Sequence, residues 1–204
     1  MPKGRVCIQM SGAPGSGKST TAKALAGPLD AVILDLDVIK TSLLDKNVPF
    51  LQAATLSYSI LWALSGDVLK QGRNLIIDCT CNYEEVINRG RTLAAENGFE
   101  YWYVECRPEV DMRVLDERLR SRQSMRSQRT GVNRPPIDAG ISQDAGQQES
   151  LFRGWIESPY RPKNNVIVVD SSQSCELCRD QIMEVMEIKW HKSRAIVGPL
   201  GASL

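Results

Sequence analysis

The stretch Gly12-Ala13-Pro14-Gly15-Ser16-Gly17-Lys18-Ser19-Thr20 decides the fold, and it follows directly on the apolar run 6–10. Residues 12–19 match the Walker A phosphate loop in full. A strand that ends in a glycine-rich turn and continues as a helix directs backbone N–H groups and the positive end of the helix dipole into one small space. Because a triphosphate fits that space, the stretch predicts nucleotide binding by an α/β fold.

The residue types within this loop predict separate roles. Gly12, Gly15 and Gly17 allow backbone conformations and close approaches that a side chain would block. Lys18 is expected to reach the outer phosphates, and the Ser19 hydroxyl to join a magnesium shell. The expected nucleotide-binding residues of the loop are Gly12, Ala13, Pro14, Gly15, Ser16, Gly17, Lys18, Ser19 and Thr20. The alternative, a glycine-rich turn that binds nothing, is disfavoured because both flanks also agree with the motif.

The bulk composition fits one globular domain spanning residues 1–204, with 42% hydrophobic and 24% charged residues. A formal net charge of +1 gives no overall attraction to nucleic acid or to an anionic membrane. No run approaches the roughly 20 apolar residues of a membrane span, and the N-terminal residues leave no room for a signal peptide. Six cysteines, several of them in apolar runs, indicate reduced thiols. We therefore expect a cytoplasmic protein with no membrane partner.

Strand-like and helical patterns alternate along the chain without an internal repeat. Runs typical of buried strands occupy residues 6–10, 31–35, 74–78, 99–106 and 166–170. Helical patterns occupy residues 20–26, 38–44, 53–70, 83–96, 108–119 and 175–189, the first stopping at Gly27-Pro28 and the fifth opening on Pro108. The alternation predicts a three-layer P-loop NTPase fold with a five-stranded parallel sheet and ligands at the carboxyl ends of its strands. The tail 190–204 receives no assignment.

A basic, polar segment follows the fifth helical pattern. Residues 126–148 carry few apolar side chains, so we expect a functional lid at about 120–150 rather than a disordered stretch. Arg118 and Arg122 are four residues apart, so one helix face can direct both at the same phosphates, and Arg122 is also assigned to the nucleotide. Arg126 and Arg129 are candidates to join this clamp. A solvated basic face and a nucleic-acid patch remain as alternatives.

Acidic side chains end two of the expected strands. Asp37 is the candidate general base that takes a proton from an acceptor hydroxyl, and Asp35 is expected to brace it or to hold water on magnesium. Asp78 is the expected magnesium residue, as in a Walker B strand. The alternative is that these carboxylates only solvate strand ends. Cys79 stands where ATP-driven motors carry a glutamate, and no guanine-reading Asn-Lys-x-Asp motif is present, so both classes are disfavoured.

The acceptor pocket is expected between Lys40 and Leu61 and after Asp78, with Asp35, Asp37, Lys40 and Thr80 as candidate substrate-binding residues. Residues 48–51 suggest an apolar lining. Trp155 and Tyr160 are candidates to stack on a ligand, although packing of Trp155 on one helix face is favoured. The lone Cys175-x-x-Cys178 motif is read as helix surface in preference to a zinc or redox site.

Taken together, four segments resemble the small P-loop kinases that phosphorylate hydroxyl groups, a set that includes adenylylsulfate kinase, polynucleotide 5′-kinases, zeta-toxin kinases and chloramphenicol phosphotransferases. The segments are GAPGSGKST at 12–20, LDLDVIK at 34–40, NLIIDCTCN at 74–82 and VLDERLRSR at 114–122. In that group the second acid of Asp-x-Asp looks like the general base, which corresponds to Asp37. Two positions depart from the group's pattern: Lys40 replaces its usual arginine, and Cys81 separates Thr80 from Asn82.

These patterns predict an ATP- and Mg²⁺-dependent kinase that transfers the γ-phosphoryl group to a hydroxyl of a small molecule. The catalytic candidates are Asp37, Lys18, Arg118 and Arg122, and the metal candidates are Ser19 and Asp78. Two alternatives stay open. One is a polynucleotide 5′-hydroxyl kinase, with nucleic acid as a less favoured partner, and the other is an ATP-sensing module without transfer chemistry.

Overall fold

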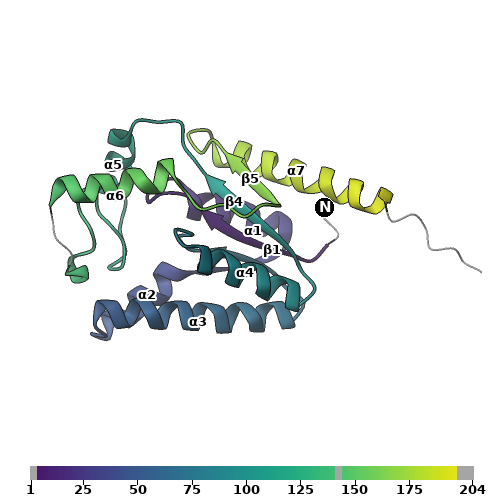
Figure 1. Cartoon of the computed structure of the whole chain (residues 1–204), viewed down its shortest axis with the longest axis horizontal. Coiled ribbons are helices and arrows are strands. Elements are labelled where there is room, and N and C mark those ends of the chain that lie inside the picture. The colour runs from purple at the N-terminus through teal and green to yellow at the C-terminus, as the bar shows by residue number, and fades with distance from the viewer. Residues whose placement is uncertain (1–3, 141–143, 197–204) are drawn as a thin grey trace, which may run out of the picture.

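The computed structural model describes residues 4–140 and 144–196 and contains a five-stranded sheet within them. Its order is β2-β3-β1-β4-β5, and every neighbouring pair is parallel (Figure 1). The strands are β1 (Val6–Ser11), β2 (Ala31–Asp35), β3 (Asn74–Asp78), β4 (Glu100–Cys106) and β5 (Val166–Val169). Near-continuous apolar runs are typical of parallel strands covered on both faces, so the predicted α/β sheet is confirmed.

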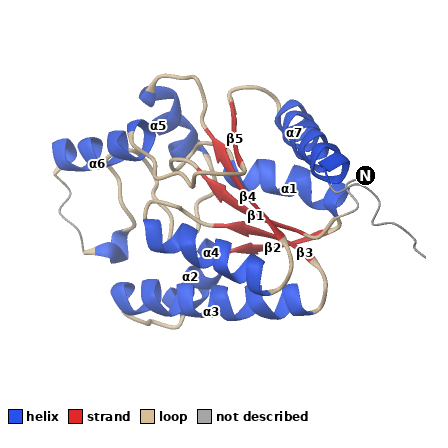
Figure 2. Ribbon diagram, turned by 45° about the vertical axis from the view of Figure 1, so that its right-hand side comes forward, coloured by secondary structure: helices blue, strands red, loops and turns tan. Residues whose placement is uncertain are grey.

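Helices cover both faces of the sheet, which makes three layers (Figure 2). On one face, α1 (Lys18–Leu29) and α7 (Cys175–Ile196) pack on Ile8 and Met10 of β1. On the other face, α3 (Phe50–Lys70) and α4 (Glu84–Glu96) pack on Ile77 of β3 and Tyr103 of β4. The short helix α2 (Leu36–Asp45) follows β2 directly and contacts α3. Alternate side chains of each strand therefore supply two separate cores.

A third apolar cluster packs against the phosphate loop. It joins Ala13 of the loop to Leu115 and Leu119 of α5 (Met112–Ser121) and to Phe152 of α6 (Ala145–Glu157). An ideal Cβ on Gly15 would lie 3.3 Å from the Leu115 carbonyl oxygen and from Leu119 Cγ. The packing of α5 thus fixes the outer side of the loop through direct contact.

Several helix boundaries differ from the sequence predictions, and two of these differences have a clear local cause. The helix α1 does not stop at Gly27-Pro28 but runs to Leu29, because a proline in the last turn removes only one helical hydrogen bond and Asp30 closes the end in a left-handed conformation. The helix expected from Pro108 begins only at Met112, where the Asp111 carboxylate accepts the Arg113 N–H at 2.9 Å.

The helix α6 begins inside the segment expected to be a lid. Asp144 caps it by accepting the Gln147 N–H at 2.9 Å, and Phe152 anchors it in the third cluster. Between α5 and α6 lies a short 3₁₀ turn, η1 (Ile137–Ala139). The lid itself stays a prediction.

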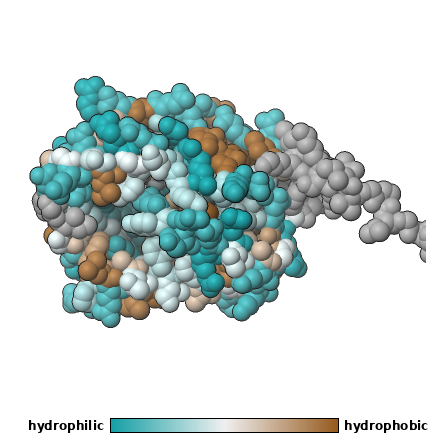
Figure 3. All heavy atoms as spheres, viewed as in Figure 1, coloured by the Kyte–Doolittle hydropathy of each residue, from teal (hydrophilic) through white to brown (hydrophobic). Residues whose placement is uncertain are grey.

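The tail 190–204 had no assignment from the sequence and lies partly outside the described residues. The backbone of α7 is helical to Ile196. No helix of the described ranges has the length and apolar character needed to cross a bilayer. On the face drawn in Figure 3, hydrophilic residues dominate and apolar residues form small separate groups.

Candidate functional site

The phosphate loop joins β1 to α1 in a conformation that depends on glycine. The φ angles of Gly12, Gly15 and Gly17 are 128°, 81° and 92°, in the region that side chains disfavour. An ideal Cβ on Gly12 would lie 2.3 Å from the carbonyl oxygen of Cys106, so β4 leaves no space for a larger residue. Gly17 precedes α1 and carries no side chain to cap it. The first N–H groups of α1 are thus available to an anion.

Two side chains brace this loop. The Lys18 ammonium donates to the carbonyl oxygens of Gly12 at 2.8 Å and Ala13 at 3.0 Å. The Ser171 hydroxyl, from the loop between β5 and α7, donates to the Ser16 carbonyl at 2.6 Å. The second contact was missed by sequence reasoning because it joins residues 155 positions apart. The loop is therefore held by Lys18 at the start of α1 and by Ser171 after β5.

The register of the sheet brings two acids beside the loop. Asp35 of β2 pairs with Asp78 of β3, and Asp78 pairs with Met10 of β1. Burial raises the pKa of Asp35 to about 6, and the Asp78 carboxylate adds to that shift. Burial also raises the pKa of Asp78, while a hydrogen bond from Ser19 and the charge of Lys18 oppose the rise. A cation bound near Asp35 and Asp78 would lower the pKa of both carboxyl groups and so favour their ionised forms.

The donor set around Asp78 fits magnesium. Ser19 and Asp78 offer a hydroxyl and a carboxylate in hydrogen-bond contact, and both line the same pocket. Among the described residues, no group of three or more His, Cys, Asp and Glu side chains is placed to hold a metal. Magnesium needs no such cage, because it binds through one or two carboxylates together with waters and substrate phosphates. Ser19 and Asp78 are the residues that would hold it.

Asp37 lies in the first turn of α2, where the Asp35 carboxylate accepts its N–H at 2.8 Å. Both carboxylate oxygens of Asp37 accept hydrogen bonds: Oδ1 from the Ser127 hydroxyl at 2.8 Å and Oδ2 from the Gln128 amide at 2.9 Å. Sequence reasoning missed Ser127 and Gln128, because no local pattern connects them to a residue about ninety positions earlier. Their contacts fix the orientation of the candidate base.

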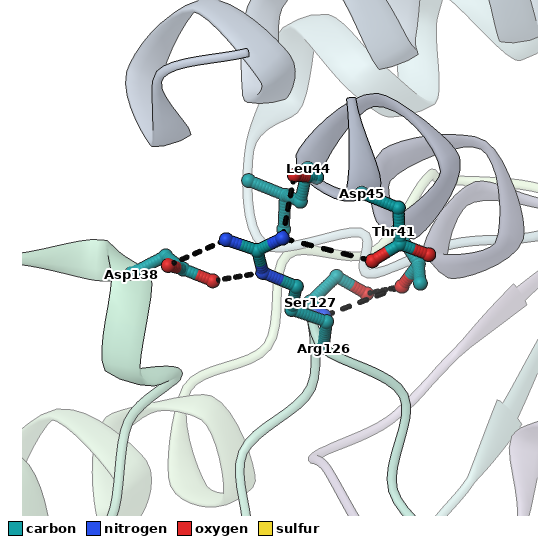
Figure 4. A network of polar contacts seen from close by, with 6 residues as sticks. All are labelled: Thr41, Leu44, Asp45, Arg126, Ser127 and Asp138. Atoms are coloured by element: carbon teal, nitrogen blue, oxygen red, sulfur yellow. Dashed lines mark hydrogen bonds and ion pairs between the residues drawn. The ribbon is translucent and has the colours of Figure 1, made fainter. Parts of the chain in front are cut away.

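The segment that carries Ser127 is docked on α2 (Figure 4). The Arg126 guanidinium donates to the Leu44 carbonyl at 2.6 Å and to both Asp138 oxygens at 2.7 and 3.0 Å. The Ser127 N–H also donates to the Thr41 hydroxyl at 3.2 Å. Arg126 thus anchors the segment to the end of α2 and does not line the pocket among the described residues.

The other arginines differ from one another in their surroundings. Arg118 lies on α5, and Arg122 is the residue that ends this helix, with its N–H still donating to the Arg118 carbonyl at 3.2 Å. Both line the pocket. Burial lowers the pKa of Arg122 and the Asp37 charge raises it. Arg129 is buried: it donates to Gln148 at 2.8 Å and lies 5.4 Å from the Trp155 ring centre.

A pocket of about 800 Å³ connects these groups. Its lining includes most of the predicted site residues: Pro14, Gly15, Gly17, Lys18, Ser19, Thr20, Asp37, Lys40, Asp78, Thr80, Arg118 and Arg122. Four predicted residues are absent from that lining among the described residues: Gly12, Ala13, Ser16 and Asp35. Residues from α3 and α6 also line the pocket. On α6 these are Trp155, which the sequence offered as a candidate ligand contact although packing was favoured, and Leu151, which the sequence did not single out. The phosphate loop, Asp37 and Asp78 therefore border one cavity.

Several solved structures share this fold at low sequence identity. A protein from Chloroflexus aurantiacus j-10-fl, provisionally described as a kinase, is 19% identical with a TM-score of 0.68, over 92% of this chain and 98% of that one. The APS kinase of Mycobacterium tuberculosis, in complex with AMPPNP and APS, is 20% identical with a TM-score of 0.56, over 91% and 99% of the two chains. A gluconokinase from Sinorhizobium meliloti 1021 is 16% identical with a TM-score of 0.56, over 93% and 97%.

A comparison with curated proteins finds no match to this sequence. A family model described as an AAA domain matches residues 8–143. This range includes β1, the phosphate loop, the acidic ends of β2 and β3, and the arginine residues between 118 and 134. The match covers most of the chain, and the resemblance to small P-loop kinases agrees with it. This chain belongs to that AAA domain family, AAA_33.

Proposed function

We propose that this chain is an ATP-dependent kinase that transfers the γ-phosphoryl group to a hydroxyl of a small molecule. The observation that carries the proposal is that Asp37 and Lys18 line one cavity with the phosphate loop. A site that only stored a nucleotide would need no oriented carboxylate beside its phosphates. The APS kinase and the gluconokinase share the fold over more than nine-tenths of the chain, which supports the same proposal.

Each residue of the site has a role in the proposed reaction. The loop N–H groups, Lys18, Arg118 and Arg122 bind the phosphates of ATP and stabilise charge on the transferring oxygens. When bound by Ser19 and Asp78, magnesium would neutralise part of the phosphate charge. The acceptor oxygen forms a bond to the γ-phosphorus, the bond to the ADP oxygen breaks, and the acceptor proton moves to the Asp37 carboxylate.

The hydrogen bonds to Asp37 are compatible with this proton transfer. A carboxylate offers about four lone-pair positions. Ser127 and Gln128 occupy one position on each oxygen, so positions remain for an acceptor hydroxyl. We infer that these two side chains orient the base without blocking it.

The function is tested by ADP release from Mg·ATP in the presence of a panel of metabolites with hydroxyl groups. We expect at least one acceptor to stimulate ADP release, with a phosphorylated product visible by mass spectrometry. The Lys18→Ala protein is the blank, since it lacks the phosphate-binding ammonium. ATP binding without release above that blank for any acceptor would favour the sensing module instead.

The arginine contacts disfavour the polynucleotide alternative. Arg120 pairs with Asp116 at 2.6 Å, Arg126 pairs with Asp138, and Arg129 is buried, so these side chains do not form an open basic stripe. We expect single-stranded DNA and RNA to bind weakly even at low salt. Tight binding that falls steeply as salt rises would support the polynucleotide kinase.

We also propose that the protein acts in a reducing compartment such as the cytoplasm. All six cysteines are free, and five of them are buried. Burial raises the pKa of Cys106 to about 11, which keeps that thiol protonated and unreactive.

A further inference from the structure

Two helices present apolar rows to the same cavity. On α3, Phe50, Ala54 and Tyr58 are spaced four residues apart and all line the pocket. On α6, Leu151 and Trp155 have the same spacing and line it too. In both ribbon views α6 lies above α2 and α3 on the left-hand side of the molecule (Figures 1 and 2). The cavity beside Asp37 thus has apolar walls from two directions.

Part of this apolar surface is uncovered. Leu151 is 46% exposed and Tyr83, another lining residue, is 66% exposed. Leu51 and Ile137, the residues after the lining residues Phe50 and Pro136, are 78% and 92% exposed and do not themselves line the pocket among the described residues. The turn η1 contacts α3. A ligand with apolar surface would remove this area from water and gain free energy from doing so.

Four polar side chains of this half of the pocket, those of Ser57, Tyr58, Ser127 and Gln128, donate hydrogen bonds within the protein. The Ser57 hydroxyl donates to the Ala54 carbonyl at 2.8 Å, and the Tyr58 hydroxyl donates to the Thr80 carbonyl at 3.4 Å. Ser127 and Gln128 are bound to Asp37. The Lys40 ammonium lies 3.7 Å from the centre of the Phe50 ring. The donors of these side chains are therefore not available to the hydroxyls of a free sugar, which costs such a ligand affinity.

We propose that the acceptor is an alcohol whose hydroxyl is attached to a flat apolar body, such as an aromatic ring, that packs between α3 and α6. Free sugars and other polyols are excluded as good acceptors by the same surface. This inference rests on the proposed kinase function only in that it calls the bound alcohol the phosphoryl acceptor. The binding of the apolar body itself can be measured without ATP.

The test is ligand-observed NMR without nucleotide, using 2-phenylethanol and 2-naphthalenemethanol as flat apolar alcohols and glucose, gluconate and glycerol as polyols. We expect the first two to bind and the polyols not to bind. Leu151→Gln should weaken the binding of 2-phenylethanol about tenfold, which corresponds to the loss of one buried leucine contact. Leu64→Gln is the matched control, because Leu64 is 43% exposed on α3 and does not line the pocket among the described residues.

A melting curve for each variant shows that it folds. Equal effects of the two substitutions, binding of the polyols in preference to the flat alcohols, or no binding of the flat alcohols at millimolar concentration would each overturn the inference. ADP release with the same compounds separates this result from the proposed function. Binding without turnover by any alcohol contradicts the kinase and leaves the pocket chemistry standing, whereas turnover of polyols alone contradicts the pocket chemistry and leaves the kinase standing.

Discussion

The two halves of the pocket are built in different ways. The nucleotide half consists mainly of backbone: three glycines with positive φ, the start of α1 and the ends of neighbouring strands. The acceptor half consists of side chains from α2, α3, α6 and the segment around Ser127, which are far apart in the sequence. The first half depends on close approaches of the chain and the second on long-range hydrogen bonds and packing. Substitutions should therefore affect the halves through different mechanisms.

The largest effect is expected at Gly12. An alanine there would place a Cβ 2.3 Å from the Cys106 carbonyl in a backbone conformation that disfavours side chains. We expect Gly12→Ala to lower the free energy of unfolding by about 2–4 kcal/mol and to abolish ATP binding, measured by denaturant titration and calorimetry. The control is Gly154→Ala at an exposed position of α6, where a Cβ meets nothing within 4 Å and alanine should raise stability. Tight ATP binding by the Gly12 variant would refute the backbone argument.

Asp37→Asn should lower the rate of phosphoryl transfer without weakening ATP binding. The amide keeps the shape of the side chain but cannot take the acceptor proton, so we expect turnover to fall about 10²- to 10⁴-fold. ATP affinity should change little, because the nucleotide half is built without this carboxylate. Steady-state ADP release and calorimetric titration with ATP measure the two quantities. Turnover at the unmodified rate would remove Asp37 from the mechanism.

Gln128→Ala tests whether the segment that carries Ser127 and Gln128 orients the Asp37 carboxylate. Loss of one hydrogen bond to a charged group is expected to lower kcat about tenfold with little change in the KM for ATP. The effect should vanish when Asp37 is already asparagine, because the two side chains act together. A double-mutant cycle on kcat checks this, and additive losses would mean that Gln128 acts elsewhere. Gln181→Ala, at an exposed position of α7, is the matched control.

The smallest effect concerns Asp35. Burial raises the pKa of Asp35 to about 6 in the folded protein, from 3.8 for the ordinary side chain. Between about pH 4 and pH 6 the folded protein therefore keeps a proton that the unfolded chain releases. The resulting stabilisation is present below about pH 4 and is lost as the pH rises to about 6. Asp35→Asn keeps a residue that caps α2 but removes this titration. Denaturant titrations of both proteins at several pH values should show a smaller loss of stability with rising pH in the variant, and identical slopes would contradict the shift.

The sequence predicts the nucleotide half well, because a single contiguous motif and short-range alternation specify it. The strands 31–35 and 74–78 have the predicted bounds, since apolar runs ended by an acid leave little freedom. The acceptor half was predicted only in part. The packing of distant segments decides which side chains meet Asp37, here Ser127 and Gln128. It also decides that Leu151 and Trp155 of α6 line the pocket. The start of α5 at Met112 shows the same limit, because capping by Asp111 outweighs the preference of proline for a first turn.

The central claim is that Asp37 faces the phosphoryl group held by the phosphate loop. A crystal structure with AMPPNP and Mg²⁺ tests it directly. We predict that an Asp37 oxygen lies about 5–6 Å from the γ-phosphorus, which leaves room for one acceptor oxygen within hydrogen-bond reach of the carboxylate. A γ-phosphorus more than about 10 Å from Asp37, or separated from it by packed side chains, would contradict the account.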